Sequence, residues 1–236
     1  MLGGDISQAR VPAAALEMIH TYSLIHDDLP GMDNDDYRRG RLTNHKVFGE
    51  GFAILAGDGL LNYAYECILK NALDYGANLE GHILAAREIA QRAGVGGMVA
   101  GQSIDLLSEH REPNEATLHY IHMHKTADLL TAPLLAAAYI AGADEKWIAA
   151  LRTFGACVGL AFQIDDDLLD VMGDAKDLGK QTGMDEQRGK MTWPSLVGVE
   201  AAQKKSRELW TQAEEVFGDS AWFLREFAEA LAKRKK

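Results

Sequence analysis

The sequence contains little of what marks secreted proteins, zinc proteins or β-sheet proteins. Among its 236 residues there are only two cysteines, Cys67 and Cys157, and five prolines. Neither cysteine belongs to a Cys-x-x-Cys pair, so no disulfide framework or zinc finger is indicated. The β-branched residues never form an alternating pattern, which argues against an extended sheet. Two free thiols in apolar surroundings are typical of a reducing compartment, and we therefore expect a cytoplasmic protein.

Positive charge and long apolar runs are also scarce. The 24 Lys and Arg residues are outnumbered by 35 Asp and Glu residues, which gives a net charge of -11. Because the one basic run is the terminal Lys233-Arg234-Lys235-Lys236, we expect no nucleic-acid partner. The most apolar run, Leu129 to Ala143, contains Pro133 and is too short to cross a membrane, so no membrane span is expected. No signal-peptide pattern is found at the start of the sequence. No GxxxxGK[ST] loop, which binds phosphate through backbone amides, occurs either. An anionic ligand would therefore need cations to bind this acidic protein.

Helix-forming segments are abundant. Apolar residues make up 47% of the chain and recur at helical spacing without a dividing linker. This pattern predicts one all-α domain over residues 1–236, with a central first helix because that helix has almost no polar face. Gly101 allows close approach by a neighbouring helix or a ligand. The expected helices cover residues 11–28, 52–73, 79–92, 115–143, 147–170, 194–217 and 221–233, with a glycine-led helix carrying Gln102 and Asp105.

The stretch from Leu24 to Gly40 carries five aspartates and two arginines around a Pro-Gly break. Carboxylates this dense repel one another unless a cation lies among them. Since Mg²⁺ binds a few carboxylates and keeps positions for water or phosphate oxygens, we interpret Asp27, Asp28 and Asp33 as a platform for Mg²⁺ and a phosphorylated substrate. A solvated acidic turn is the alternative that this stretch alone leaves open.

A second aspartate-rich segment, Asp165 to Asp170, ends another strongly apolar helix. Asp166 and Asp170 are four residues apart and Asp167 and Asp170 are three apart, so one helix face carries converging carboxylates. Acidic residues at a helix C-terminus oppose its dipole, and a divalent cation would compensate for this. Facing each other across a helical bundle, the two clusters would hold Mg²⁺ and a diphosphate above an apolar cavity for a hydrocarbon chain.

Three histidines and a lone lysine lie between His119 and Thr126. Only His119 and His122 share a helix face, and no Cys or Glu-x-x-His completes a tetrahedral set, so zinc is not expected. Lys125 is flanked by apolar turns. It either extends to the surface or binds an anion inside the protein.

Seven motifs follow one another in an order that is typical of a known family. They are Asp27-Asp28-(four residues)-Asp33 with Arg38-Arg39-Gly40, Gly101-Gln102-x-x-Asp105, Lys125-Thr126, Phe162-Gln163, Asp166-Asp167-Leu168-Leu169-Asp170, Gly179-Lys180 and Gly189-Lys190-x-Thr192-x-Pro194. In this order they resemble the trans-isoprenyl diphosphate synthases (polyprenyl synthetases), and most nearly the short-chain bacterial farnesyl diphosphate synthases. The resemblance covers essentially the whole chain.

The resemblance implies an all-α, isoprenoid synthase-type helical bundle around a central apolar cavity. It also implies a homodimeric, Mg²⁺-dependent prenyltransferase of isoprenoid biosynthesis that condenses isopentenyl diphosphate with dimethylallyl or geranyl diphosphate. Three Mg²⁺ ions are expected once diphosphate is bound. The implied metal ligands are Asp27, Asp33 and Asp166, supported by Asp28 and Asp170.

The same resemblance assigns substrate contacts residue by residue. Arg38, Lys125 and Lys180 would hold the allylic diphosphate, and Arg39 would contact isopentenyl diphosphate. Lys190 would also bind substrate, and Thr126 and Gln163 would line the reacting carbons. The residues implied to carry catalysis are Asp27, Asp28, Asp33, Lys125, Thr126, Gln163, Asp166 and Lys180.

Product length should follow from the depth of the cavity below the first cluster. Ser23 lies one helical turn before Asp27, and the larger Tyr22 precedes it. In the family an aromatic residue at the position of Tyr22 is typical of a cavity floor, which favours farnesyl diphosphate, with geranylgeranyl diphosphate as the alternative. The other interpretation of Tyr22 is simple packing against a neighbouring helix.

The sequence departs from the family at its start. Family members begin with helices that carry a Gly-Lys-x-x-Arg-Pro-like motif and a histidine for isopentenyl diphosphate, and nothing here matches them. We therefore expect a truncated chain that lacks part of the isopentenyl diphosphate site. Smaller departures are Asn34 at a usually acidic position and the extra Asp165.

Three alternative functions fit the residues less well. A class I terpene cyclase usually has one strict aspartate cluster, and a non-catalytic prenyl synthase subunit tends to lose one, whereas both clusters are present here. A carboxylate-bridged di-iron protein would need a second Glu-x-x-His besides the one at Glu17 and His20.

Overall fold

The computed structural model describes residues 1–112, 114–172 and 189–233. These residues are helical almost throughout, which confirms the all-α prediction. In chain order the elements are α1 (Ile6–Asp27), β1 (Tyr37–Arg38), β2 (Arg41–Leu42), α2 (Asn44–Phe48), α3 (Glu50–Asp74), η1 (Gly76–Asn78), α4 (Leu79–Ala93), α5 (Met98–Ser108), α6 (Glu115–Ile121), the π-helix η2 (His122–Ala127), α7 (Asp128–Ile140), α8 (Glu145–Met172), α11 (Trp193–Val197), α12 (Val199–Glu215), η3 (Gly218–Ala221) and α13 (Trp222–Ala232).

The chain forms two compact units. The amino-terminal unit comprises Leu2–Ala90 and Ala136–Ala143. The carboxyl-terminal unit comprises Met1, Gln91–Leu135 and the chain from Asp144 onward. A single domain over residues 1–236 and a central apolar cavity stay predictions.

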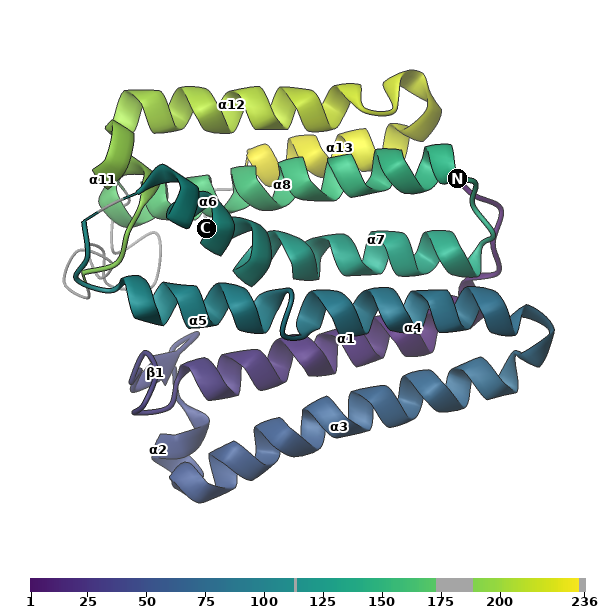
Figure 1. The fold of residues 1–236 in the computed structure, drawn as a ribbon, viewed down its shortest axis with the longest axis horizontal. Coiled ribbons are helices and arrows are strands. Elements are labelled where there is room, and N and C mark those ends of the chain that lie inside the picture. The colour runs from purple at the N-terminus through teal and green to yellow at the C-terminus, as the bar shows by residue number, and fades with distance from the viewer. Residues whose placement is uncertain (113, 173–188, 234–236) are drawn as a thin grey trace. The chain divides into compact units, whose positions relative to one another are not determined.

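In the amino-terminal unit, α1 and α3 run side by side in opposite directions (Figure 1). α1 begins earlier than expected because Asp5 caps it, with its carboxylate accepting a hydrogen bond from the Ser7 backbone N–H at 2.9 Å. α3 passes without interruption through Gly57, where a Cβ would collide with the ring of His26. The glycine therefore allows α1 and α3 to approach closely.

A small hairpin that the sequence analysis did not predict follows α1. Tyr37 pairs with Leu42 and Arg38 with Arg41. The two residues between the strands, Arg39 and Gly40, have φ angles of 50° and 74°. Positive φ at both positions is typical of a type I′ turn, which matches the twist of two antiparallel strands. The strands are too short for periodicity to reveal, so Gly40 was the only local signal.

In the carboxyl-terminal unit, α12 lies along α8 (Figure 1). α8 supplies much of the core, including the buried Phe154 and Ile164. Among the helices described, α8 alone is long and apolar enough to cross a membrane, and 56% of its most apolar window is buried. A central helix of a folded domain has the same properties, so this is weak support for a membrane span, and the absence of one stays a prediction.

The segment expected as one continuous helix over residues 115–143 is divided. Asn114 caps α6 through a hydrogen bond from the Thr117 backbone N–H at 3.0 Å. The turn that follows, His122–Ala127, is a π-helix rather than an α-helix. Such turns are rare and occur frequently at functional sites.

Candidate active site

The chain turns back on itself at the end of α1, within the first cluster. Asp27 is the last residue of α1, and the chain then turns back so that the Asp33 backbone N–H donates to the Asp27 carbonyl at 2.8 Å. Asn34, the departure noted in the sequence, has a φ of 52°. Asparagine tolerates this left-handed conformation better than most residues, which explains its presence at the turn.

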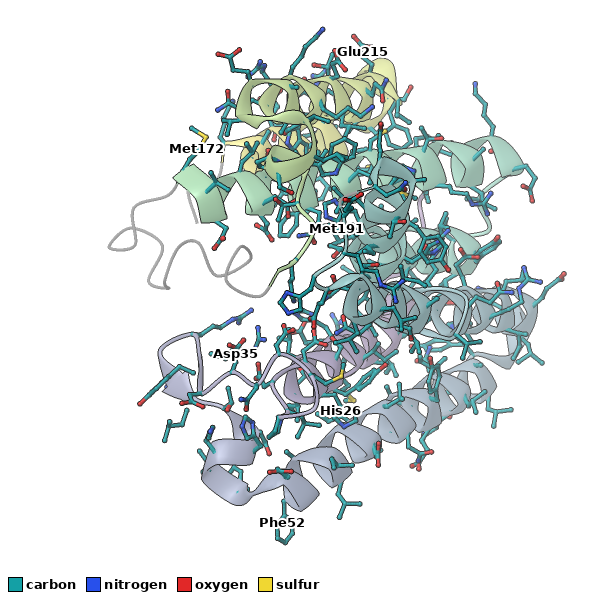
Figure 2. The ribbon with its side chains drawn as sticks, turned by 60° about the vertical axis from the view of Figure 1, so that its left-hand side comes forward. His26, Asp35, Phe52, Met172, Met191 and Glu215 are labelled. Atoms are coloured by element: carbon teal, nitrogen blue, oxygen red, sulfur yellow. The ribbon has the colours of Figure 1, made fainter. Side chains whose placement is uncertain are left out.

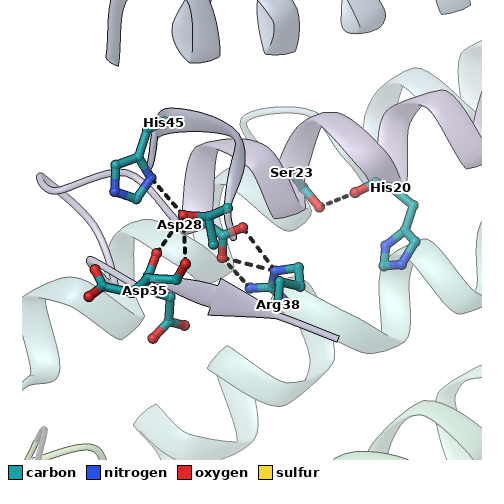
Figure 3. Close-up of polar contacts among 8 residues, drawn as sticks. His20, Ser23, Asp28, Asp35, Arg38 and His45 are labelled. Atoms are coloured by element: carbon teal, nitrogen blue, oxygen red, sulfur yellow. Dashed lines mark hydrogen bonds and ion pairs between the residues drawn. The ribbon is translucent and has the colours of Figure 1, made fainter. Parts of the chain in front are cut away.

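Asp28 forms a forked ion pair with Arg38. The carboxylate is buried, with 3% of the residue exposed. Arg38 Nε donates to Asp28 Oδ1 and Oδ2 at 2.9 and 3.0 Å, and Nη2 donates to Oδ1 at 2.7 Å (Figure 3). Burial alone would lower the pKa of Arg38, but the hydrogen bonds to Asp28 and the charges of Asp27 and Asp35 raise it. Arg38 is thus a fixed cation within the cluster, while metal binding by Asp28 stays a prediction.

The two other aspartates of this stretch help to hold the loop. Thr43 Oγ1 donates to the Asp35 carbonyl at 2.7 Å, and the Thr43 backbone N–H donates to the Asp36 carbonyl at 3.0 Å. The Asp36 carboxylate lies 2.7 Å from Lys46 Nζ. These contacts hold the hairpin that carries Arg38 and the exposed Arg39.

Tyr22 and Ser23 differ in their surroundings. Tyr22 is buried, and its ring meets His26 edge-on with 5.6 Å between the centroids. Burial, Tyr65 and Asp27 raise the pKa of Tyr22, so its phenol stays neutral. Ser23 Oγ donates to the His20 carbonyl within α1 at 2.9 Å (Figure 3). The role of Tyr22 as a cavity floor stays a prediction.

In the second cluster, Asp165 serves the packing of α8. Its carboxylate accepts hydrogen bonds from Ser206 Oγ at 2.5 Å and from Trp210 Nε1 at 2.8 Å. Both partners belong to α12. The extra aspartate that the sequence analysis noted therefore fastens α8 to α12.

Asp167 is likewise engaged in the interior. It is buried, and its Oδ2 accepts a hydrogen bond from the Trp193 backbone N–H at 2.9 Å. Trp193 Nε1 in turn donates to His122 Nδ1 at 3.1 Å. Because Nδ1 accepts this bond, the neutral His122 ring carries its proton on Nε2. His122 Nε2 lies 3.6 Å from Asp167 Oδ2. Burial lowers the pKa of His122 to about 3, so the imidazole is neutral. Asp166 and Asp170, four residues apart on α8, are predicted to hold Mg²⁺, and that role stays a prediction.

Two lysines of the predicted site converge on Asp105. Lys125 Nζ donates to Asp105 Oδ2 at 2.6 Å, and Lys190 Nζ lies 3.7 Å from the same oxygen. Next to Lys125, Thr126 Oγ1 donates to Gln163 Oε1 at 2.7 Å. The structure thus brings four predicted residues together from η2, α8 and the segment before α11. Lys180, the other predicted lysine, lies outside the described residues.

Gln102 lies one helical turn before Asp105 on α5. Both of its side-chain polar atoms are buried, and neither has a hydrogen-bond partner in the part of the chain that the structure describes. A buried amide without partners is costly, and such groups in native proteins often have a functional reason. The Gly101-Gln102-x-x-Asp105 motif therefore contributes both a lysine partner and a polar group that could bind a ligand.

The sequence analysis missed a set of polar residues around η2. Arg92 Nη1 lies 2.5 Å from Asp128 Oδ1, and His124 Nδ1 lies 2.7 Å from Asp128 Oδ2. The spacing of His124 and Asp128 by four residues is a local signal of this contact. Arg92 is too distant in sequence for any such signal.

Both clusters offer oxygen ligands that suit Mg²⁺. Across the described ranges, no three His, Cys, Asp or Glu side chains gather closely enough to hold a metal by themselves. Since the clusters lie in different units, their joint action on one diphosphate stays a prediction.

Comparison with known proteins agrees with the motifs. The polyprenyl synthetase family model matches residues 1–221. Geranylgeranyl pyrophosphate synthase 9 of Arabidopsis thaliana is 46% identical over 220 residues, which are 91% of this chain and 60% of the relative. Farnesyl diphosphate synthase of Geobacillus stearothermophilus is 48% identical over 204 residues, which are 86% of this chain and 68% of the relative. This chain thus spans about three fifths of the length of the plant relative.

Solved structures give the same answer. A geranyltransferase from Helicobacter pylori, complexed with magnesium and isoprenyl diphosphate, has a TM-score of 0.81 at 34% identity, covering 94% of this chain and 72% of that one. An FPP/GFPP synthase from Zymomonas mobilis has a TM-score of 0.84 at 35% identity, covering 97% and 78%. From the motifs, the fold and these relatives together, the chain belongs to the polyprenyl synthetase family.

Proposed function

We propose that this protein is a cytoplasmic, Mg²⁺-dependent prenyltransferase. It condenses isopentenyl diphosphate with dimethylallyl or geranyl diphosphate, and farnesyl diphosphate is its final product. Family membership and the named relatives support the reaction class. Within the molecule, the proposal is carried by one observation: Lys125, Lys190, Thr126 and Gln163 meet beside the second aspartate cluster.

In the first step, cationic side chains of this chain would stabilise the diphosphate leaving group. As the allylic C–O bond breaks, negative charge grows on the diphosphate, and Lys125, Lys190 and Arg38 would offset it. Asp105 holds the two lysines in the protein without substrate. The diphosphate would compete with Asp105 for their ammonium groups.

The carbon chemistry would follow on the apolar side of these cations. The double bond of isopentenyl diphosphate attacks the allylic carbon, and a proton is then lost to the departing diphosphate. Thr126 and Gln163 would orient the reacting carbons, with the Thr126 hydroxyl fixed by its hydrogen bond to Gln163. Mg²⁺ held by Asp27, Asp33 and Asp166, with Asp28 and Asp170 in support, would supply the remaining positive charge through three ions.

An assay with defined substrates tests the reaction. The purified chain is given isopentenyl diphosphate, geranyl diphosphate and Mg²⁺, and the dephosphorylated products are separated by chromatography. Farnesol supports the proposal, whereas a cyclic hydrocarbon would indicate a cyclase. A protein that is silent alone and active after addition of a second prenyl synthase subunit would be a partner subunit.

Geranylgeranyl diphosphate is the alternative product, because several Arabidopsis relatives carry that activity in their names. The buried Tyr22 favours the shorter product, since its ring occupies space one turn before the first cluster. Tyr22→Ala should lengthen the product, and Ser23→Ala serves as the matched control. If both variants make only farnesyl diphosphate, Tyr22 is not the floor.

A homodimer is also proposed, with α3 as the contact. Phe52 is 71% exposed and its ring points away from the ribbon (Figure 2). Exposed apolar rows of this kind mark protein contacts, and a two-fold axis lets identical rows meet. Phe52→Asp should shift the sedimenting species from dimer to monomer, whereas Trp222→Asp on α13 should not. The exposed row on α2 and α3 comprises Phe48, Phe52, Leu55, Tyr63, Leu69 and Leu73.

A further inference from the structure

The π-helix η2 carries Lys125 and Thr126 and is enclosed by neighbouring helices that leave it no spare room. A Cβ at Gly101 on α5 would collide with the Lys125 backbone nitrogen, and a Cβ at Gly159 on α8 would collide with Ala127. The widened turn therefore fits only because both neighbours are glycine. The sequence left open whether Gly101 allows the approach of a helix or of a ligand. The structure shows the backbone of another helix, η2, in contact with Gly101.

Asp128 follows the widened turn directly and binds two partners. It is 8% exposed, and its two oxygens accept separate hydrogen bonds, one from Arg92 at 2.5 Å and one from His124 at 2.7 Å. Because a carboxylate only accepts, His124 Nδ1 must carry a proton. The Tyr120 ring lies against His124, with 4.2 Å between centroids. Asp128 thus fastens the turn to α4 through Arg92 and to the turn's own residue His124.

We propose that Asp128 is a positioning residue for the allylic diphosphate, an inference that rests on the function proposed above. Together with Arg92 and His124 it fixes the π turn, and the turn sets where the Lys125 ammonium and the Thr126 hydroxyl lie. Asp128 acts through those two groups and contacts no substrate itself. Without this network, the extra residue of the π turn is no longer held in register, and both groups shift.

The kinetic signature separates positioning from simple stabilisation. A displacement of about 1 Å in a positioning group can cost about a hundredfold in rate. Asp128→Ala should therefore lower kcat/KM for geranyl diphosphate by about ten- to a hundredfold. The KM for isopentenyl diphosphate should change by less than about twofold, because that substrate is not held by the turn.

A second variant keeps the protein folded. Asp128→Ala breaks the ion pair of Asp128 with Arg92, which is destabilising by itself, whereas replacing a buried ion pair by apolar residues of similar volume is often neutral. The double variant Arg92→Met/Asp128→Leu should therefore keep the melting temperature of the wild type and still show the loss in kcat/KM. Asp74→Ala, which removes the exposed pair with Lys70 on α3, is the matched control and should change neither quantity.

Two measurements without turnover separate this inference from the proposed function. Amide hydrogen exchange at residues 122–127 should be faster in the double variant, and calorimetry should show about tenfold weaker binding of magnesium pyrophosphate. If the wild type makes no prenyl diphosphate, the proposed function fails, and these two measurements still decide the role of Asp128. The inference is overturned if the stable double variant keeps wild-type exchange at the turn, or keeps both the wild-type kcat/KM for geranyl diphosphate and the wild-type pyrophosphate affinity.

Discussion

The two aspartate clusters have similar composition and different construction. The first lies at a helix end and its loop, and it contains its own cation because Arg38 forms a forked pair with the buried Asp28. The second lies within the last turns of α8 and has no comparable arginine in its motif. Two of its aspartates, Asp165 and Asp167, are bound by neutral donors instead.

Because of this difference, some carboxylates stabilise the structure and others are predicted to bind a cation. In the first cluster the fixed positive charge of Arg38 offsets the mutual repulsion of the carboxylates. In the second, indole, hydroxyl and backbone donors stabilise two of the four aspartates and tie α8 to α11 and α12. Asp166 and Asp170 are the aspartates of this cluster for which Mg²⁺ binding is predicted, and a bound cation would also offset the unfavourable helix dipole.

The largest expected effect comes from removing one proposed metal ligand in either cluster. Asp27→Ala and Asp166→Ala should each lower kcat/KM by about a thousandfold, roughly 4 kcal/mol of transition-state stabilisation, because the charge developing on the diphosphate loses its metal. Steady-state product formation at saturating Mg²⁺ is the measurement. Asp74→Ala, on the exposed surface of α3, is the matched control.

Combining the Asp27→Ala and Asp166→Ala substitutions tests whether the two clusters act on the same step. If both are needed for one diphosphate, Asp27→Ala/Asp166→Ala should be about as slow as either single variant. Multiplicative losses would mean that the clusters act independently.

A smaller effect, on stability, should distinguish adjacent aspartates of the second cluster. Asp167→Ala leaves the buried Trp193 N–H without its acceptor and should lower the free energy of unfolding by about 3 kcal/mol. Asp166→Ala should lower that free energy by less, because Asp166 is partly exposed whereas Asp167 is buried. Urea denaturation of both variants gives the comparison, and equal losses would contradict the division of tasks.

Much of this architecture could be predicted from the sequence because the responsible signals are local. Helical periodicity predicted the all-α fold. The Asp27-to-Asp33 spacing predicted a metal site, which stays a prediction, and the structure shows a turn there in which the Asp33 backbone N–H donates to the Asp27 carbonyl. Lys125, Thr126, Gln163 and Lys190 were found by motif order, which is local information combined with the family resemblance. The expected helix over residues 115–143 was wrong at one turn, because a π-helix depends on neighbours such as Gly101 rather than on its own sequence.

The contacts that the sequence could not predict join distant residues. Nothing near Asp165 indicates that Ser206 and Trp210 bind it, so the residue looked like a departure from a motif. The pairing of Arg92 with Asp128 also depends on tertiary packing. The hairpin at residues 37–42 was not predicted, because each of its strands has only two residues and shows no alternation of apolar and polar side chains. The only local signal is the Arg39-Gly40 turn.

A pH measurement tests the neutral donors of the second cluster. His122 has its pKa lowered by burial to about 3, against about 6.5 when unfolded. Between these values the unfolded chain binds the extra proton, so stability falls as pH decreases from about 6.5 and is unaffected by this group above it. Wild type should lose up to about 1.4 kcal/mol per pH unit more than His122→Gln between about pH 6 and pH 4. Parallel stability curves for the two proteins would contradict a buried, neutral His122.

The smallest expected effect concerns the cation of the first cluster. Arg38→Lys keeps the charge but replaces a planar fork by a point charge, so one ammonium must serve both Asp28 and the diphosphate. We expect kcat/KM for geranyl diphosphate to fall by about tenfold, roughly 1.4 kcal/mol, with no loss of Mg²⁺ dependence. Arg39→Lys is the matched control, since its exposed side chain should affect the KM for isopentenyl diphosphate alone. Equal effects of both substitutions on geranyl diphosphate would mean that the forked pair is only structural, and that the charge balance of the first cluster comes from elsewhere.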